Sequence, residues 1–350
     1  MVIPASTLAL GVTCALTAGI MCGIFALPMK YLGRWSWENV WAIFILVSCV
    51  AMPLAITWLT VPDWVQVIES APAHATRTAC MTGFAWGFGA IMFGQGVSAV
   101  GISMSNTVVL AMSASLGSLF PIWLLAPDRL HRPQGHVIIA GTIIGIAGIA
   151  MCGYAGLLRE RSQANDKEAA RGEMVGHARP IAVGLLLCVG AGILSAVLNI
   201  GYSSAQPLLS SAMRHGYSSF GGSNVIWLLM LTSGAVPNLI FCSYLLSRNE
   251  SWAKYRTPNG RSLYGLTLLM GLLWGGDIFL YGFASPKIGR LGPAIGWPLK
   301  LIAGLIAANV AGYLAGEWKL TRARDQRWMT LGLAVLLAAI ITLGWASTLQ

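Results

Sequence analysis

Two ionisable side chains lie inside apolar segments of this sequence. Asp277 interrupts the run GLLWGGDIFLYGFASPKIGRLG (Gly271–Gly292), and Lys300 interrupts the next run. At about 1.5 Å per helical residue, each lies roughly 12 Å from the loop between the runs, which predicts matching depths on consecutive helices. Buried charges cost several kcal/mol unless paired or hydrated, so they usually face a protein interior. We interpret Asp277 as a candidate for substrate binding and proton coupling, and Lys300 as a candidate substrate ligand.

Each of these charges also has a structural interpretation. Asp277 and Lys300 can form an ion pair with no role beyond stability, and a long lysine side chain can also extend outward to the membrane surface. In the functional interpretation, protonation of Asp277 releases Lys300 and changes which face of the site is open. The sequence leaves both interpretations in place.

Aromatic and amide side chains supply further candidates for binding a neutral polar solute. Trp86, Trp274 and Tyr281 are suited to stacking on the C–H face of a sugar, although such rings also serve as packing. Amides hydrogen-bond sugar hydroxyls, but they also hold membrane helices together. Gln95 and Asn199 are the amide candidates for the site. The other intramembrane amides are Asn106, Asn224, Asn238 and Asn309. Trp35, Trp37 and Trp41, close to Lys30 and Arg34, predict an interfacial belt.

Composition defines the elements that position these residues. The chain has 350 residues, of which 56% are hydrophobic and 10% charged, and this is too little charge for a soluble protein of its size. The fold class is an all-α integral membrane protein, since a spanning helix needs about 20 apolar residues and satisfies its own backbone. Ten transmembrane helices are predicted, near residues 7–28, 39–60, 79–98, 104–126, 136–157, 180–203, 224–247, 262–285, 292–316 and 327–346.

The basic residues predict the orientation in the membrane. Fifteen lysines and arginines fall after odd-numbered helices and six after even-numbered ones. The positive-inside rule then places the odd loops in the cytoplasm and both termini outside, in the periplasm if the cell has two membranes. The net charge of +10 follows from this bias toward an anionic leaflet, so the lipid bilayer is an expected partner and nucleic acid is not.

The chain reads as two related halves. At an offset of 188 residues, the third and eighth predicted helices share one tryptophan and four glycines in one frame: Trp86/Trp274, Gly83/Gly271, Gly87/Gly275, Gly94/Gly282 and Gly101/Gly289. The predicted organisation is a first five-helix repeat at 1–157, a cytoplasmic linker at 158–179 and a second five-helix repeat at 180–350. Because five crossings are odd, the second repeat enters the membrane from the opposite side. Inverted repeats of this kind are typical of secondary transporters.

Other classes of function lack their residues. The seven cysteines fall in apolar runs without metal-ligand spacing, so we predict no metal site, no disulfide and no cofactor. A membrane-embedded enzyme needs a catalytic set at membrane depth, such as HExxH. The five histidines instead lie in loops or at the ends of predicted helices. The chain is therefore not expected to be an enzyme.

Several segments are similar to one known family. They are PMKYLGRWSWENVW (Pro28–Trp41), GFAWGFGAIMFGQGVSAVGISMS (Gly83–Ser105), GILSAVLNIGYSSAQP (Gly192–Pro207) and the GLLW that begins at Gly271. Together they resemble the L-rhamnose/proton symporter family of the drug/metabolite transporter superfamily, over nearly the whole chain. The resemblance implies proton-coupled import of a 6-deoxyhexose, most specifically L-rhamnose, across the bacterial inner membrane by alternating access. Its implied partners are a small-molecule sugar and protons. The alternative is an exporter or exchanger of a metabolite on the same fold, in which Asp277 and Lys300 form a fixed pair.

Overall fold

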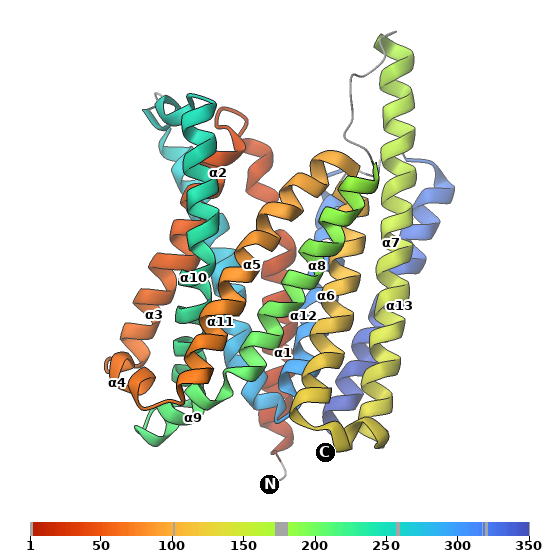
Figure 1. The fold of residues 1–350 in the computed structure, drawn as a ribbon. Coiled ribbons are helices and arrows are strands. Elements are labelled where there is room, and N and C mark those ends of the chain that lie inside the picture. The colour runs from red at the N-terminus through yellow and green to blue at the C-terminus, as the bar shows by residue number, and fades with distance from the viewer. Residues whose placement is uncertain are drawn as a thin grey trace.

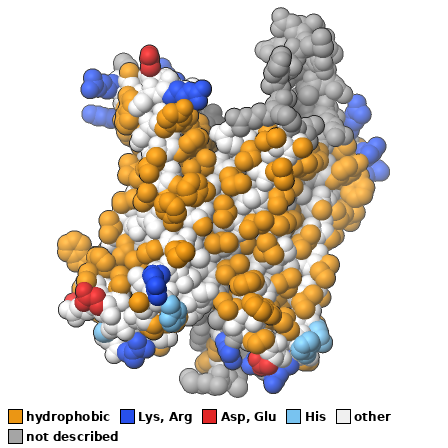
Figure 2. All heavy atoms as spheres, in the orientation of Figure 1, with side chains coloured by type: hydrophobic (Ala, Val, Ile, Leu, Met, Phe, Trp, Pro, Cys, Tyr) orange, Lys and Arg blue, Asp and Glu red, His pale blue; other side chains and the backbone are white. Residues whose placement is uncertain are grey.

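The protein is a bundle of long helices (Figure 1). The computed structural model describes residues 3–100, 102–171, 181–256, 260–316, 318 and 321–349, and these contain no strand. Nine helical segments of this described part are long and apolar enough to cross a membrane. Hydrophobic side chains cover the middle of the face drawn in Figure 2, and charged side chains gather toward its two ends. The prediction of an all-α integral membrane protein is confirmed.

The long helices follow the predicted order. They are α1 (Ala5–Ile24), α2 (Trp37–Ile45) continuing through η2 (Leu46–Ala51) into α3 (Met52–Thr60), α5 (Ala73–Val100), α6 (Ile102–Leu125), α7 (Pro133–Arg171), α8 (Ile181–Ser204), α10 (Ser219–Arg248), α11 (Arg261–Ile288), α12 (Gly292–Leu314) and α13 (Ala323–Thr348). Short connecting elements are η1 (Leu27–Tyr31), α4 (Trp64–Glu69), η3 (Pro127–His131), α9 (Gln206–Arg214) and η4 (Ser251–Arg256).

Helix α5 is the long helix that is not among the nine apolar ones. It has 28 residues. At about 1.5 Å per residue this is more than the roughly 30 Å of a hydrocarbon core. Its sequence contains several glycines, Trp86 and Gln95, which lower its hydropathy. It packs against α8 and α10, so protein side chains cover much of it.

The second predicted span is one helix with an irregular centre. The segment η2 is a π-helical turn between α2 and α3, and Pro53 lies at the start of α3. Proline has no N–H to donate to the preceding turn, and π turns are a common local response to such an interruption. The turn lies beside α11, the helix that carries Asp277.

Helix contacts form matching sets in the two halves. Helix α1 packs against α11 and α12, and α8 packs against α5 and α6. Helix α5 also contacts α10, while α11 contacts the irregular second span. The last helices of the two halves, α7 and α13, lie side by side (Figure 1). These contacts are the ones expected if the helices of the second half correspond in order to those of the first.

Glycines allow the closest of these contacts. A side chain at Gly23 of α1 would overlap the carbonyl group of Gly304 on α12, and one at Gly19 would overlap the carbonyl of Lys300. Gly83 of α5 lies in the same way against Met230 of α10. Association of helices in lipid depends on packing, and small residues let backbones approach. The position of Lys300 is thus determined partly by two glycines on α1.

The SWE motif at Ser36–Glu38 has a structural role at the start of α2. The Glu38 carboxylate is buried and accepts hydrogen bonds from the Asn249 amide (3.1 Å) and the Ser251 hydroxyl (2.7 Å). The neighbouring Asn39 amide donates to the Ser251 carbonyl at 2.9 Å. Hydrogen bonds to a charged acceptor are stronger than neutral ones. The motif thereby joins the start of α2 to the loop after α10.

The predicted interfacial belt is wrong for two of its three tryptophans. Trp35 is 6% exposed and donates from Nε1 to the Lys254 carbonyl at 3.0 Å. Trp41 lines an internal cavity and donates from Nε1 to Asn238 Oδ1 at 3.1 Å. Trp35 packs against Tyr255 of η4 and Tyr264 of α11, whereas Trp41 faces α10. A cluster of tryptophans close to basic residues in the sequence does not show whether the indole rings face lipid or other helices.

Both chain termini lie at one end of the bundle, together with α4 and α9 (Figure 1). At the opposite end α7 extends beyond its neighbours and stays helical to Arg171. The first part of the predicted linker at 158–179 therefore continues a helix. Its residues from 172 on lie outside the described part of the chain.

Candidate functional site

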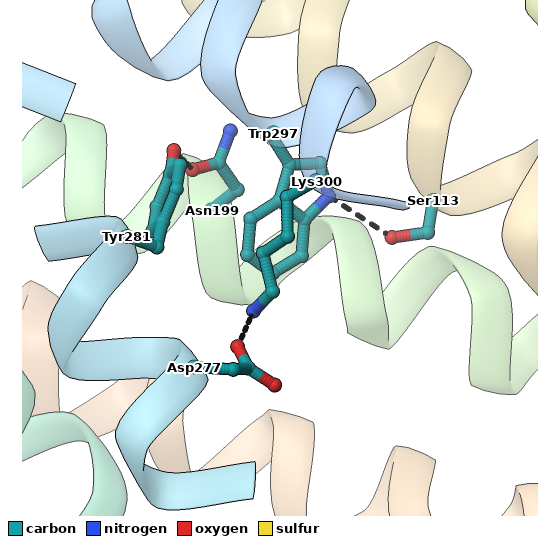
Figure 3. A network of polar contacts seen from close by, with 6 residues as sticks. All are labelled: Ser113, Asn199, Asp277, Tyr281, Trp297 and Lys300. Atoms are coloured by element: carbon teal, nitrogen blue, oxygen red, sulfur yellow. Dashed lines mark hydrogen bonds and ion pairs between the residues drawn. The ribbon is translucent and has the colours of Figure 1, made fainter. Parts of the chain in front are cut away.

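Asp277 and Lys300 form a buried ion pair. Lys300 Nζ contacts Asp277 Oδ1, and the two side chains are 2% and 0% exposed (Figure 3). They meet because α11 and α12 are joined by a tight turn at Gly289, whose φ of 101° suits glycine, and because each residue lies about equally far from that turn. Removing two charges from water costs several kcal/mol for each ion, and the pair recovers this only with good geometry.

Two aromatic rings complete the surroundings of the lysine. Lys300 Nζ lies 5.0 Å from the centroid of Trp297 and 5.6 Å from that of Tyr281. Both distances are within the range of cation–π attraction, which strengthens when the cation is desolvated. The ammonium is therefore held by one carboxylate and two ring faces.

Asn199 and Tyr281 belong to a hydrogen-bonded network toward the end of the bundle that carries the termini. The Tyr281 hydroxyl donates to Asn199 Oδ1 at 2.6 Å, as Figure 3 shows. Asn199 Nδ2 donates to the Gly117 carbonyl at 2.7 Å and to the Pro293 carbonyl at 3.0 Å. One amide thus joins α6, α8, α11 and α12, and in this conformation its donors and acceptor are used within the protein.

A second set of hydrogen bonds lies beside this network. Trp297 Nε1 donates to Ser113 Oγ at 3.2 Å (Figure 3), and the Ser113 hydroxyl donates to Ser195 Oγ at 3.1 Å. These bonds connect α12 to α6 and α6 to α8. Together with the Asn199 bonds they close the bundle between Lys300 and the end with the termini.

On the other side of Lys300 lies a cavity of about 190 Å³, which we call the central cavity. Its wall is mainly apolar and rich in aromatic rings, among them Trp86, Trp274 and Trp297, with Lys300 as a charged member. It shares lining residues with a larger space of about 510 Å³, the entry cavity, which extends to Met29 and Trp37. The path from Lys300 therefore leads toward the end of the bundle opposite the termini.

Trp86 and Trp274 stack on each other in this wall. Their ring centroids are 5.3 Å apart and the planes are inclined by 15°. Phe44 contacts Trp274 edge to face, with centroids 5.7 Å apart. Offset stacking of this kind leaves one ring edge or face available to a solute in the cavity.

The structure divides the seven predicted site residues into groups. Trp86, Trp274 and Lys300 line the central cavity, while Asp277 lies directly behind Lys300. Asn199 and Tyr281 lie in the hydrogen-bonded network, and neither lines the cavity. Gln95 of α5 does not line it either. Phe25, Phe44 and Trp41 of the wall were not among the candidates, because nothing in an apolar run distinguishes an aromatic residue at a cavity from one in the core.

Comparison with known proteins assigns the family. The family model of the L-rhamnose-proton symport protein matches residues 5–347. The chain belongs to that family. The family is one of transporters and not of enzymes, as the sequence predicted.

Individual relatives of the L-rhamnose-proton symport family are similar over their full length. The L-rhamnose-proton symporter of Yersinia pestis (strain Pestoides F) is 27% identical over 347 residues, which cover 97% of this chain and 98% of the relative. The L-rhamnose-proton symporter of Yersinia pseudotuberculosis serotype O:1b (strain IP 31758) gives the same values. The aligned region therefore spans both halves of the chain.

Proposed function

We propose that this protein is a proton-coupled secondary transporter that imports a 6-deoxyhexose, most specifically L-rhamnose, across the bacterial inner membrane by alternating access. The observation that carries the proposal is membership of the L-rhamnose-proton symport family over residues 5–347. The buried ion pair of Asp277 and Lys300, beside a cavity lined by aromatic rings, supports a site that couples a proton to a solute. The choice of L-rhamnose as the substrate rests on relatives that are named as L-rhamnose-proton symporters.

The proposed architecture is ten transmembrane helices in two inverted five-helix repeats, at 1–157 and 180–350, joined by the linker at 158–179. Helix α5 is the proposed tenth span, and its length supports this role. The matching helix contacts of the two halves support the duplication. Further support comes from equivalent glycines: Gly83 meets α10, and Gly271 meets Val47 of the second span. Inverted repeats place a substrate site between the halves, near the membrane midplane.

The proposed orientation has both termini in the periplasm. It rests on the excess of lysine and arginine after odd-numbered helices. The position of both termini at one end of the bundle agrees with an even number of crossings. In this orientation the entry cavity extends toward the cytoplasm, and the network around Asn199 closes the periplasmic side.

Proton coupling follows from the position of Asp277 behind Lys300. A proton on the carboxylate removes the negative charge that holds the ammonium, and an ammonium without a counter-ion is strongly disfavoured in a dry interior. Lys300 then turns toward the central cavity, where water and substrate hydroxyls solvate it. Because Lys300 also contacts Trp297 and Tyr281, this movement weakens the closed side of the bundle. Proton binding and opening toward the periplasm are thereby linked.

Transport in vesicles tests the proposal. In proteoliposomes with an inward proton gradient, we expect labelled L-rhamnose to accumulate above its equilibrium level, and a protonophore to abolish the accumulation. Equal uptake with and without the gradient would contradict symport. Accumulation only when the gradient points outward would instead identify an exporter or exchanger of the same fold. Protein-free liposomes under the same gradient are the control.

A further inference from the structure

Asn106 of α6 is a half-buried amide at the meeting point of the internal spaces. It lines the central cavity and the entry cavity, and also a side cavity of about 170 Å³ between α6, α7 and α12. A solute that moves between the entry cavity and Lys300 therefore passes this side chain.

The hydrogen bonds of Asn106 differ from those of the other intramembrane amides. Asn199 and Asn238 donate to carbonyls of neighbouring helices, and Asn309 donates to the Leu305 carbonyl of its own helix. Asn224 Nδ2 donates to the Thr60 hydroxyl. Within the described part of the chain, the Asn106 amide makes no hydrogen bond. Asn199, Asn224 and Asn238 therefore join helices, and Asn309 is bonded within its own helix, whereas Asn106 does neither in the described structure.

Several other polar groups on the wall of the central cavity are bonded within the protein. Lys300 pairs with Asp277, and Ser195 accepts from Ser113. The indole nitrogens of Trp41 and Trp297 donate to Asn238 and Ser113. Asn106 is the amide of this wall, and it offers both a donor and an acceptor to the cavity in the described structure.

A neutral sugar needs such a group. Each buried hydroxyl must replace its hydrogen bonds to water, and an amide can donate to one hydroxyl while accepting from its neighbour. We propose that Asn106 binds adjacent ring hydroxyls of the transported sugar, while Phe25 and Phe93 of the same wall face its apolar surface. This inference rests on the proposed function, because it takes a 6-deoxyhexose as the substrate.

Deoxy sugars combined with variants at Asn106 test this assignment. The variants are Asn106→Leu, which has a similar shape without polar atoms, and Asn106→Ser, which is smaller and guards against misfolding of the first. Asn309→Leu is the matched control, because that amide lines only the side cavity. Affinities for L-rhamnose and its 2-, 3- and 4-deoxy derivatives are measured calorimetrically on each purified full-length protein.

We expect Asn106→Leu to bind L-rhamnose about tenfold more weakly than the unaltered protein does. The two deoxy derivatives that lack these adjacent hydroxyls should each bind the unaltered protein about tenfold more weakly than L-rhamnose does. In Asn106→Leu and Asn106→Ser, each should lose less further affinity than L-rhamnose loses. Asn309→Leu should keep the pattern of the unaltered protein. If the deoxy derivatives show the same ratios to L-rhamnose in the Asn106 variants as in the unaltered protein, the assignment is overturned while the proposed function stands. If the unaltered protein neither binds nor accumulates L-rhamnose, both are overturned.

Discussion

The indole rings of Trp86 and Trp274 stack on each other with centroids 5.3 Å apart, although 188 positions separate them in the chain. They occupy equivalent places in the two predicted repeats, one on α5 and one on α11. Residues related by a pseudo-twofold axis meet only if they lie close to that axis. The stack therefore supports an axis that passes through the wall of the central cavity, where both rings lie.

The tryptophan stack should show energetic coupling. We expect Trp86→Leu and Trp274→Leu together to destabilise the protein less than the sum of the single changes, with a coupling of about 0.5–1.5 kcal/mol. Denaturant unfolding in detergent measures it. Trp86→Leu combined with Trp345→Leu, whose ring is exposed on α13, should be additive. Additive effects in the first pair would show that the contact contributes nothing specific.

Replacement of Asp277 by asparagine should uncouple transport from the proton. The amide keeps the shape of the side chain but cannot take up a proton, so gradient-driven accumulation of L-rhamnose should fall to the equilibrium level while exchange of labelled for unlabelled sugar continues. Uptake and exchange assays in proteoliposomes separate the two activities. Asp63→Asn, outside the long helices, should accumulate normally. Unchanged accumulation in Asp277→Asn would remove this residue from the coupling role.

The buried ion pair should respond to mutation as a unit. Either Asp277→Asn or Lys300→Met leaves one charge buried without its partner, which costs about 3–5 kcal/mol. The double variant removes both charges. We therefore expect it to be more stable than Asp277→Asn, which keeps the unpaired lysine, as measured by thermal unfolding in detergent. A double variant whose loss equals the sum of the single losses would show that the charges do not interact.

Tyr281→Phe should favour the conformation that is open toward the periplasm. It removes the donor to Asn199 Oδ1 and leaves a buried oxygen unsatisfied, a loss of about 1–3 kcal/mol from the closed side. In a cysteine-free background, Ser195→Cys on the cavity wall should then react faster with an impermeant thiol reagent added outside. Tyr255→Phe removes a hydrogen bond to the Asn39 carbonyl at the opposite end and should give no increase. An unchanged rate in Tyr281→Phe would exclude the network as the closing contact.

Gly23→Ala should weaken the contact between α1 and α12. The added methyl group would overlap the Gly304 carbonyl, and overpacking of this kind typically costs about 1–3 kcal/mol. Because α12 carries Lys300, transport should fall together with thermal stability. Gly265→Ala of α11 is the control, since nothing lies within 4 Å of its added methyl group. Equal stability of the two variants would mean that α1 and α12 separate at no cost.

The sequence by itself determined the membrane class, the order of the helices and the matched depth of Asp277 and Lys300. These depend on local quantities, namely the length and hydropathy of each run and the number of residues from a turn. It also identified Trp86 and Trp274 as equivalent positions, because their spacing is preserved in one frame. Family resemblance in the motifs led to the family that the comparison then assigned.

Only the tertiary structure decided which polar side chains face the cavity. Asn106 and Asn199 are both amides in apolar helices, and nothing in their own segments distinguishes them. Asn199 lies where the carbonyls of Gly117 and Pro293 meet it, whereas Asn106 lies at open space. The same holds for Trp41, which faces a cavity because α10 and α12 approach from elsewhere in the chain. Whether a polar group joins helices or remains available to a solute depends on neighbours distant in sequence, and only the packed bundle supplies them.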